Sequence, residues 1–197
     1  MKRKRSYTLK RRAERQEETR RRITEATAAL HQEIGPAATT ISAIAERAGV
    51  ERYTVYRNFP TETDLFRACQ HLFRTANPRP DLRQWAAMAD PRERLRRALR
   101  ETYGYFRATE AMTANILRDA PGIPALASLI QDVPAYYAQA RDVLAAGFRP
   151  AAKRRPVFHA ALGHALDFNT WRSLARRQGL GDEQAADLME LLVNSAL

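Results

Sequence analysis

Six of the seven residues from 52 to 58 carry polar side chains that could bind a nucleic acid: Arg52, Tyr53, Thr54, Tyr56, Arg57 and Asn58. The guanidinium of Arg52 is a planar fork that fits the O6 and N7 atoms of guanine, a contact worth about 1–3 kcal/mol of discrimination between bases. Tyr53 and Thr54 can touch a thymine methyl group or donate a hydrogen bond to a base edge or a phosphate. Arg57 and Asn58 suit phosphate or base contacts. If one helix presents these side chains together, their chemistry is the recognition of duplex DNA.

Residues 40–59 have the pattern of two short helices that would position these side chains. The apolar positions expected to be buried are Ile41, Ile44, Ala45 and Ala48 in the first helix, and Val50, Val55 and Phe59 in the second. Thr40 can cap the first helix, and Gly49 follows it, where a left-handed C-cap costs least. Two short helices joined by a tight glycine turn form a helix-turn-helix, whose second helix, here 51–58, lies in the DNA major groove. Thr40 and Ser42 would then approach phosphates from the first helix.

The stretch from Ile23 to Phe66 closely resembles the DNA-binding domain of the TetR family of bacterial repressors. The residues that carry the resemblance are Thr40, Ile44, Ala45, Ala48, Gly49, Val50, Thr54, Val55, Tyr56, Phe59, Pro60, Leu65 and Phe66. It implies that Tyr56 holds a backbone phosphate and that the helix after the helix-turn-helix transmits ligand binding to the DNA-binding helices. It also implies that the last two helices form the dimer interface, a four-helix bundle made with a second copy.

Two residues depart from the pattern of that family. Glu51 stands where many relatives carry a small hydroxyl residue, although a carboxylate there can still cap a helix. Glu62 stands where a lysine often binds phosphate, and a carboxylate cannot make that contact. We therefore expect no phosphate contact from Glu62, in a helix that runs from about residue 61 to 74 and that Thr61 and Asp64 would open as a near capping box.

The positive charge of the chain is concentrated at its N-terminus. The net charge of the 197 residues is +11, and residues 1–22 contain eleven Lys or Arg and three Glu. Such a balance points to a polyanion, either a nucleic acid or an anionic membrane surface. Residues 1–14 hold basic runs without an apolar period, so we expect a flexible arm there, ahead of a first helix from about residue 15 to 33. Beside a helix-turn-helix this arm would bind DNA, and it would compensate for the phosphate contact that Glu62 cannot make. The alternative is a solvated tail that only raises solubility.

Other classes of protein find little support in the composition. Cys69 is the only cysteine, which excludes a disulfide and a cysteine metal site. The apolar runs are far shorter than the ~18 residues that span a bilayer, and no apolar segment follows the basic N-terminus as in a secretion signal. We therefore expect a cytoplasmic protein.

From residue 81 onward the pattern is helical, without strand-like alternation. Prolines at 78 and 80 mark a boundary, so we expect a DNA-binding domain over residues 15–75 and a helical effector-binding and dimerisation domain over residues 81–197. Five helices are expected in the second domain. The first begins at Pro91, the second covers Ala111–Arg118, and the third runs from about 124 to 146 with a bend at Pro134. The fourth spans 157–177, and the fifth follows Asp182, which would cap it.

His164, Asp167, Phe168 and Trp171 have the spacing of one helix face. This face could line a small-molecule pocket in which Asp167 or His164 orients a polar or cationic ligand. The alternative is a dimer interface that contains a hydrogen-bonded His–Asp pair. Further candidates for such a pocket are Tyr103, Phe106, Leu117 and Tyr137, each of which suits an ordinary core equally well.

Signals of catalysis are few. The sequence contains no His-Glu-x-x-His motif, phosphate loop, dinucleotide glycine pattern or nucleophile elbow. We predict no enzymatic activity, no cofactor and no metal.

The sequence thus predicts an all-α protein, with an N-terminal three-helix helix-turn-helix domain followed by a helical ligand-binding and dimerisation domain. The expected function is a ligand-responsive homodimeric repressor of a palindromic operator in double-stranded DNA, with an unknown small-molecule effector and no membrane partner. One alternative is an architectural DNA-binding protein or an activator without an effector, and another is a ligand-binding or catalytic module whose basic arm is incidental.

Overall fold

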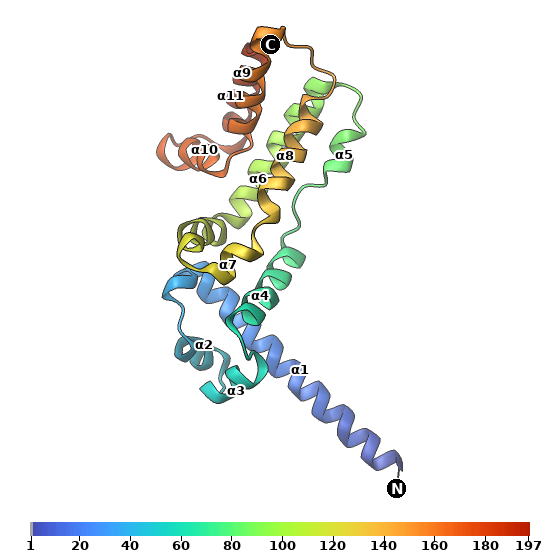
Figure 1. Cartoon of the computed structure of the whole chain (residues 1–197), viewed down its shortest axis with the longest axis vertical. Coiled ribbons are helices and arrows are strands. Elements are labelled where there is room, and N and C mark those ends of the chain that lie inside the picture. The colour runs from blue at the N-terminus through green and yellow to red at the C-terminus, as the bar shows by residue number, and fades with distance from the viewer. Residues whose placement is uncertain (1) are drawn as a thin grey trace. The chain divides into compact units, whose positions relative to one another are not determined.

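The computed structural model describes residues 2–197, with side chains from Arg11 onward (Figure 1). The described residues contain helices and no strand, which confirms the predicted all-α class. Two compact units are present: the first takes the residues up to Ala76 together with 111–130, and the second takes 77–110 together with 131–197. We expected one uninterrupted domain from residue 81 onward, whereas the structure groups residues 111–130 with the first unit.

The first unit contains the helix-turn-helix. Its elements are α1 (Lys2–Glu33), η1 (Pro36–Ala38), α2 (Ile41–Ala48), α3 (Arg52–Asn58), α4 (Glu62–Ala76), the last turns of α6 (Pro91–Asp119), η2 (Ala120–Gly122) and α7 (Pro124–Leu129). Its main core consists of Ile23, Ala26, Leu30, Ile44, Ala45, Ala48, Val55, Phe59, Leu65 and Cys69. Burial raises the pKa of the Cys69 thiol to about 12, so this cysteine is a structural residue rather than a reactive thiol.

Helix α1 begins at Lys2 rather than near residue 15, and Figure 1 shows its N-terminal part extending away from α2, α3 and α4. The prediction that residues 1–14 lack regular structure is therefore wrong from Lys2 onward, and Met1 lies outside the described residues. The segment has no glycine or proline before Gly35, and the Lys, Arg, Glu, Gln and Ala residues that dominate it are good helix formers. The charged composition of this segment suggests disorder, but its helix propensity is high enough for residues 2–14 to be helical.

The second unit is built around the first part of α6. Its other elements are α5 (Leu82–Ala86), α8 (Asp132–Ala145), η3 (Ala152–Arg154), α9 (Arg155–Ala165), α10 (Phe168–Arg172), the π-helical turn η4 (Ser173–Arg177) and α11 (Asp182–Ser195). Its largest fully buried side chains are Trp85, Leu95, Leu99, Tyr103, Phe106, Leu144, Phe158, Leu162, Trp171 and Val193. The buried Arg94 of α6 donates to the carbonyl oxygens of Val143 (3.0 Å) and Ala146 (2.6 Å), and so caps the C-terminal end of α8.

Two helix boundaries around this core differ from the expected ones. α6 is a single helix rather than two, because no glycine or proline interrupts residues 107–119. The helix expected over residues 124–146 is divided into α7 and α8, and the break lies at residues 130–131 rather than at Pro134. Pro134 lies in the first turn of α8, where its missing N–H leaves no helical hydrogen bond unmade.

The helix expected over residues 157–177 is broken at Asp167. The Asp167 carboxylate accepts a hydrogen bond from the Thr170 amide (2.9 Å) and caps α10, so it competes with continuation of α9. Asp182 was expected to cap the last helix, but it is the first residue of α11, and Gly181 is the N-cap. Both corrections concern aspartates. Aspartate is common at helix starts, but the sequence does not show whether it will be the N-cap or the first helical residue.

Candidate nucleic-acid interface

The turn between α2 and α3 is built as the sequence predicts. The Thr40 hydroxyl caps the start of α2, and Gly49 ends α2 in the left-handed region, at φ 62°. The Gly49 amide donates to the Glu46 carbonyl (3.1 Å), and the Val50 amide donates to the Ala45 carbonyl (3.0 Å). These two bonds form a Schellman motif, which satisfies the last carbonyls of α2 and sets the direction in which the chain enters α3.

The polar face of α3 is turned outward because Val55 and Phe59 anchor the opposite face in the core, with 1% and 3% of their surface exposed. The predicted site residues that lie at the surface are Thr40 and Ser42 of the α2 start and Arg52, Tyr53, Tyr56 and Arg57 of α3, with Thr54 half-buried. Tyr53 and Tyr56 are 73% and 50% exposed, although tyrosine usually buries most of its ring. Glu51 is the N-cap of α3, but its carboxylate makes no cap hydrogen bond, so the expectation that it caps this helix is wrong.

Asn58 does not belong to this outward face. It is 7% exposed, and its side-chain amide donates to the Thr54 carbonyl (2.8 Å), so the prediction that it faces DNA is wrong. The reason is its position three residues after Val55, which places both side chains on the inward face of α3.

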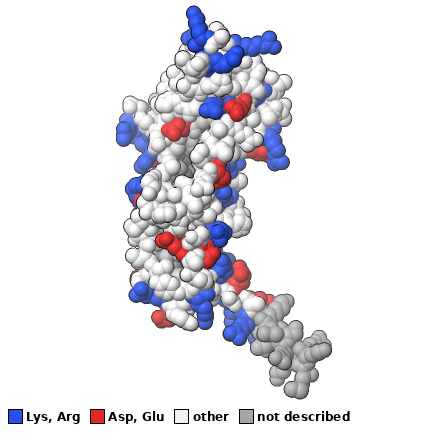
Figure 2. All heavy atoms as spheres, viewed as in Figure 1, with Lys and Arg blue, Asp and Glu red and all other residues white. Residues whose placement is uncertain are grey.

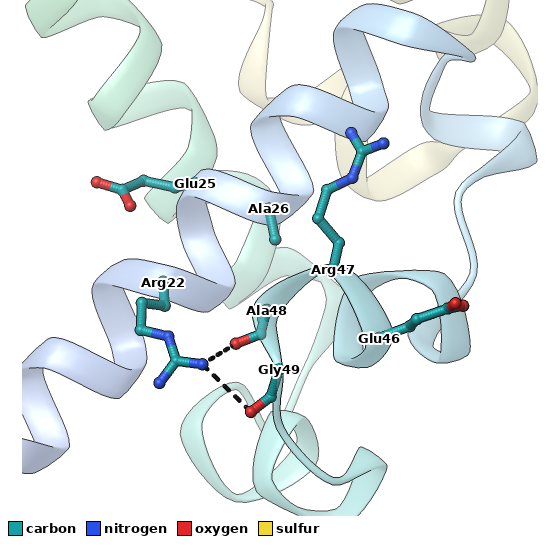
Figure 3. A pocket seen from close by; sticks show the side chains of 7 residues that line it. All are labelled: Arg22, Glu25, Ala26, Glu46, Arg47, Ala48 and Gly49. Carbon is teal, nitrogen blue, oxygen red and sulfur yellow. Dashed lines mark hydrogen bonds between the residues drawn. The ribbon is translucent and has the colours of Figure 1, made fainter.

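The three arginines at 20–22 could have held a DNA backbone, but all three have partners within the protein. Arg20 donates to the Asn58 carbonyl, Arg21 pairs with Glu18 and Glu25, and Arg22 donates to the carbonyls of Ala48 and Gly49 (Figure 3). Sequence alone gave no signal that distinguished these three neighbouring residues.

The start of α4 follows the sequence signal. The Thr61 hydroxyl accepts the Asp64 amide (3.1 Å) and donates to the Asp64 carboxylate (2.7 Å), which confirms the near capping box. Glu62 is exposed as the first residue of α4.

Positive charge on the described surface is interspersed with negative charge. Figure 2 shows Lys and Arg side chains lying next to Asp and Glu side chains at many points of the visible face. The net charge of residues 23–197 is only +3, since residues 1–22 hold eight of the eleven positive charges in excess. Electrostatic attraction to a polyanion is therefore concentrated on α1.

Five of the eight candidate ligand residues come together as an aromatic cluster in the second unit: Tyr103, Phe106, Tyr137, Phe168 and Trp171. The Phe106 ring lies 5.4 Å from that of Phe168, edge-on, and 5.9 Å from that of Trp171. The Tyr103 hydroxyl donates to the Ala165 carbonyl (3.0 Å), and burial raises the pKa of this hydroxyl well above its ordinary range.

The other three candidates lie apart from this cluster. His164 and Asp167 are exposed, and they do not share a helix face because α9 ends before Asp167. The His164 Nδ1 lies 3.0 Å from the Thr170 hydroxyl, while Asp167 caps α10, so the alternative of a His–Asp pair is also wrong. Leu117 is 44% exposed and belongs to the first unit.

One polar contact of the cluster was missed from sequence. The Asp182 carboxylate accepts a hydrogen bond from the Trp171 indole (2.9 Å) and two from Arg107 (2.6 and 2.7 Å). Burial works against the ionised carboxylate, but the bonds from Arg107 and Trp171 outweigh it and lower the pKa of Asp182. The sequence suggested only a capping role for this aspartate, because aspartate is common at helix starts. It gave no sign that the carboxylate also accepts hydrogen bonds from Trp171 and Arg107.

Within the part of the chain that the structure describes, no group of His, Cys, Asp and Glu side chains is arranged to hold a metal ion. No helix among the same residues is long and apolar enough to cross a membrane.

Residues 23–69 match the sequence model described as bacterial regulatory proteins, tetR family. This region contains the helix-turn-helix and about half of α4, and over it the chain is similar to the TetR family. No curated protein matches the chain in sequence.

Solved structures share the fold over most of the chain. The TetR family transcriptional regulator PfmR from Thermus thermophilus is 21% identical, with a TM-score of 0.64 over 87% of this chain and 94% of that one. A TetR-like transcriptional regulator from Rhodococcus sp. RHA1 is 20% identical, with a TM-score of 0.63 over 89% and 93%. A second transcriptional regulator from Rhodococcus sp. RHA1 is 18% identical, with a TM-score of 0.62 over 90% and 95%. The similarity extends the shared fold beyond the helix-turn-helix to the helices that follow it.

Proposed function

We propose that this protein is a homodimeric transcriptional repressor that recognises a palindromic operator with α3. The observation that carries the proposal is the exposure of Tyr53 and Tyr56, 73% and 50%, beside two exposed arginines on a helix whose other face is locked in the core. Large amphipathic side chains left in water on a rigid helix suit a surface that a DNA groove covers.

Each exposed residue of the interface has a role that its chemistry favours. Arg52, at the start of α3, contacts a guanine edge, and Tyr53 and Thr54 contact a thymine methyl group, a base edge or a phosphate. The remaining phosphate contacts come from Thr40, Ser42, Tyr56 and Arg57. Asn58 is omitted from this set because it is buried.

The N-terminal turns of α1 supply a sequence-independent share of the affinity. Residues 1–14 remain the basic arm of the proposal, and from Lys2 onward the arm is a helix rather than an unstructured tail. Neutralising phosphates with Lys and Arg releases counterions, so this share falls steeply as salt rises. This share of the affinity offsets the phosphate contact that is missing because position 62 holds a glutamate rather than a lysine.

Dimerisation uses α9 and α11, which lie in the two C-terminal segments that the sequence predicted as the last two helices. α9 and α11 pack together and expose large apolar side chains: Val157 (57%), Leu188 (42%), Leu191 (68%) and Leu192 (39%). Exposed apolar side chains gathered on two adjacent helices suit a face that a second copy covers. A symmetric dimer then presents two copies of α3 to two half-sites, about one helical turn of DNA apart.

Repression follows from occupancy of a promoter, and an effector would release it. The second unit offers the aromatic cluster around Phe106 as the surface for an apolar or aromatic effector. Binding there lowers specific affinity if it changes the spacing of the two copies of α3. One observation favours the alternative of a regulator without an effector: Tyr103 and Trp171 are fully buried, so a ligand must displace packed side chains.

The proposal is tested by selecting bound duplexes from a random DNA pool and titrating the recovered sequence at two salt concentrations. Sedimentation of the protein–DNA complex counts the copies bound. The expected result is an inverted repeat bound by two copies. Binding without sequence preference, or by one copy to an asymmetric site, would contradict the proposal.

A further inference from the structure

The C-terminal end of α3 has a cationic partner on α1. The last carbonyl groups of any helix lack partners within it, and α3 has only seven residues. Arg20 donates from Nη1 to the Asn58 carbonyl (2.5 Å), and its guanidinium carbon lies 4.1 Å from the centre of the Phe59 ring. A cation at a helix C-terminus is favoured by the helix dipole, and stacking on an aromatic ring fixes its orientation. Arg20 is half-buried, so solvent screens these contacts less than it would screen them on an open surface.

The C-terminal end of α2 has an equivalent partner. Arg22 donates from Nη2 to the Ala48 carbonyl and to the Gly49 carbonyl (3.2 Å), as Figure 3 shows. These two residues form the turn that leads into α3. A methyl group on Gly49 would lie only 2.9 Å from the same nitrogen, so the guanidinium and the turn are in close contact.

Arg21, between these two residues, provides an internal comparison. It is exposed and pairs with Glu18 (2.7 Å) and Glu25 (2.6 Å) of α1 itself. The two neighbours thus each cap one helix of the helix-turn-helix, while Arg21 binds within α1.

We propose that Arg20 and Arg22 are positioning residues that hold α3 in a fixed orientation on α1, and that they do not bind DNA phosphates. This inference rests on the proposed DNA-binding function and deepens it, because it names the residues that set the orientation of the helix that contacts the bases. The two residues act at the two ends of the same short segment, 48–58, so together they limit its rotation and its translation.

The surroundings of Arg22 also disfavour a phosphate contact. A hollow of about 320 Å³ lies beside it, between α1 and α2, and Glu25 and Glu46 are among the residues that line it (Figure 3). Arg47, the other arginine of the hollow, is paired with Glu33 at 2.6 Å. A phosphate placed on Arg22 would compete with the Ala48 and Gly49 carbonyls, which already accept hydrogen bonds from its guanidinium.

Hydrogen exchange of the free protein, followed by NMR, tests the capping contacts directly. In Arg20→Ala the α3 amides should exchange about ten-fold faster than in the wild type, and in Arg22→Ala the same should hold for the Gly49 and Val50 amides. The amides of α8 and α9 should be unchanged, and Arg21→Ala should exchange as the wild type does. The proposal would be overturned if the α3 amides of Arg20→Ala and the turn amides of Arg22→Ala exchanged at the wild-type rate. This outcome does not depend on whether the protein binds DNA.

Titration of the selected duplex then separates positioning from phosphate binding. Arg20→Ala and Arg22→Ala should each lower specific affinity about ten-fold, with the salt slope and the affinity for random DNA unchanged, whereas Arg57→Ala should lower the slope by about 0.9. A slope that falls by about 0.9 in Arg20→Ala or Arg22→Ala, with equal losses on both DNAs, would identify phosphate contacts and overturn the proposal.

Two controls keep this test decisive. If Arg22→Ala does not fold, Arg22→Lys keeps the charge without the planar fork, and it should show the same change in exchange and affinity to a smaller degree. Arg52→Ala tests the proposed function separately, since it should lose preference at one base pair in each half-site without changing amide exchange in the turn. A wild-type protein without site preference would sink the proposed function, while the exchange data would still decide the capping role.

Discussion

Asn115 of α6 donates its side-chain amide to the carbonyl of His31 (3.0 Å) and to that of Gln32 (2.9 Å), and so caps the C-terminal end of α1. One turn further along, Arg118 donates to the Ile34 carbonyl (3.1 Å). Within the first unit, the last turns of α6 therefore bind the end of the helix that carries Arg20 and Arg22. Residues 111–130 belong with the helix-turn-helix for this reason.

Replacing Asn115 by alanine should destabilise the first unit. The variant removes two hydrogen bonds to carbonyls at a helix end, so the free energy of unfolding should fall by about 1–2 kcal/mol. Urea unfolding followed by circular dichroism measures the change. Asn169→Ala, which alters an exposed asparagine of α10, should leave the midpoint within experimental error. Equal midpoints for the two variants would show that the Asn115 cap contributes nothing.

Replacing Gly35 by alanine should have a larger effect. Gly35 has φ 92°, and a methyl group there would lie 2.0 Å from Arg118 Nη2 and 2.6 Å from Asp119 Oδ2. Both backbone strain and this clash oppose the change, so we expect a loss of about 2–4 kcal/mol in thermal unfolding. Gly104→Ala is the matched control, since nothing lies within 4 Å of its added methyl group in α6. That variant should gain up to about 1 kcal/mol, and a Gly35→Ala protein as stable as Gly104→Ala would be inconsistent with the packing described.

Stability should decrease as the pH is lowered because of His31. Burial lowers the pKa of His31 from 6.5 to about 4, and the nearby Asp119 carboxylate only partly opposes the effect. Above pH 6.5 the residue is neutral in both states and contributes no pH dependence. Between pH 6.5 and 4 only the unfolded chain binds the proton, so the stability lost by pH 4 should reach up to about 3 kcal/mol.

The variant that isolates this contribution is His31→Leu, because leucine does not titrate and suits the contact with the Phe66 ring, 5.4 Å away. Urea unfolding of both proteins should be measured at several pH values between 4 and 8. The difference between the two curves should be flat above pH 6.5 and should change below it. Parallel curves over the whole range would show that His31 binds its proton equally in the folded and unfolded states, so that its pKa is not lowered by folding.

In the second unit, Asp182→Ala should destabilise the protein more than Asp187→Ala. Asp182 accepts hydrogen bonds from the Trp171 indole and from Arg107, whereas Asp187 is 59% exposed and lies 3.7 Å from Arg100. Leaving the buried Trp171 indole N–H without its acceptor costs about 1–3 kcal/mol, and an exposed ion pair contributes about 0–1 kcal/mol. Thermal unfolding of the two variants checks the order. Equal melting temperatures would mean that the Asp182 contacts add nothing to stability.

The helix-turn-helix could be predicted from sequence almost residue by residue. Its signals are local: Thr40 caps α2 through an amide three residues away, Gly49 takes the left-handed conformation, and Val55 and Phe59 face the core. Asn58 and Glu51 were exceptions. The inward face of a seven-residue helix is too narrow to assign Asn58, its last residue, from periodicity alone, and the Glu51 carboxylate makes no cap hydrogen bond.

The candidate ligand site was predicted less well, and the reason is a helix break. The shared face of His164 and Trp171 assumed a continuous helix, but Asp167 ends it by capping the next one. The aromatic members still gather around Phe106, since apolar rings are buried whatever the helix bounds. Contacts between distant segments, such as Asn115 with His31, leave no local pattern, and only the folded chain reveals them.

The most direct test of the central account is to repeat the duplex selection with Arg52→Ala beside the wild type. If α3 lies in the major groove as proposed, the wild type should select an inverted repeat. The variant should lose preference at one base pair in each half-site, with specific affinity reduced by about 5- to 150-fold. The same inverted repeat recovered with unchanged affinity from Arg52→Ala would mean that α3 does not contact the bases as described, and would contradict the account.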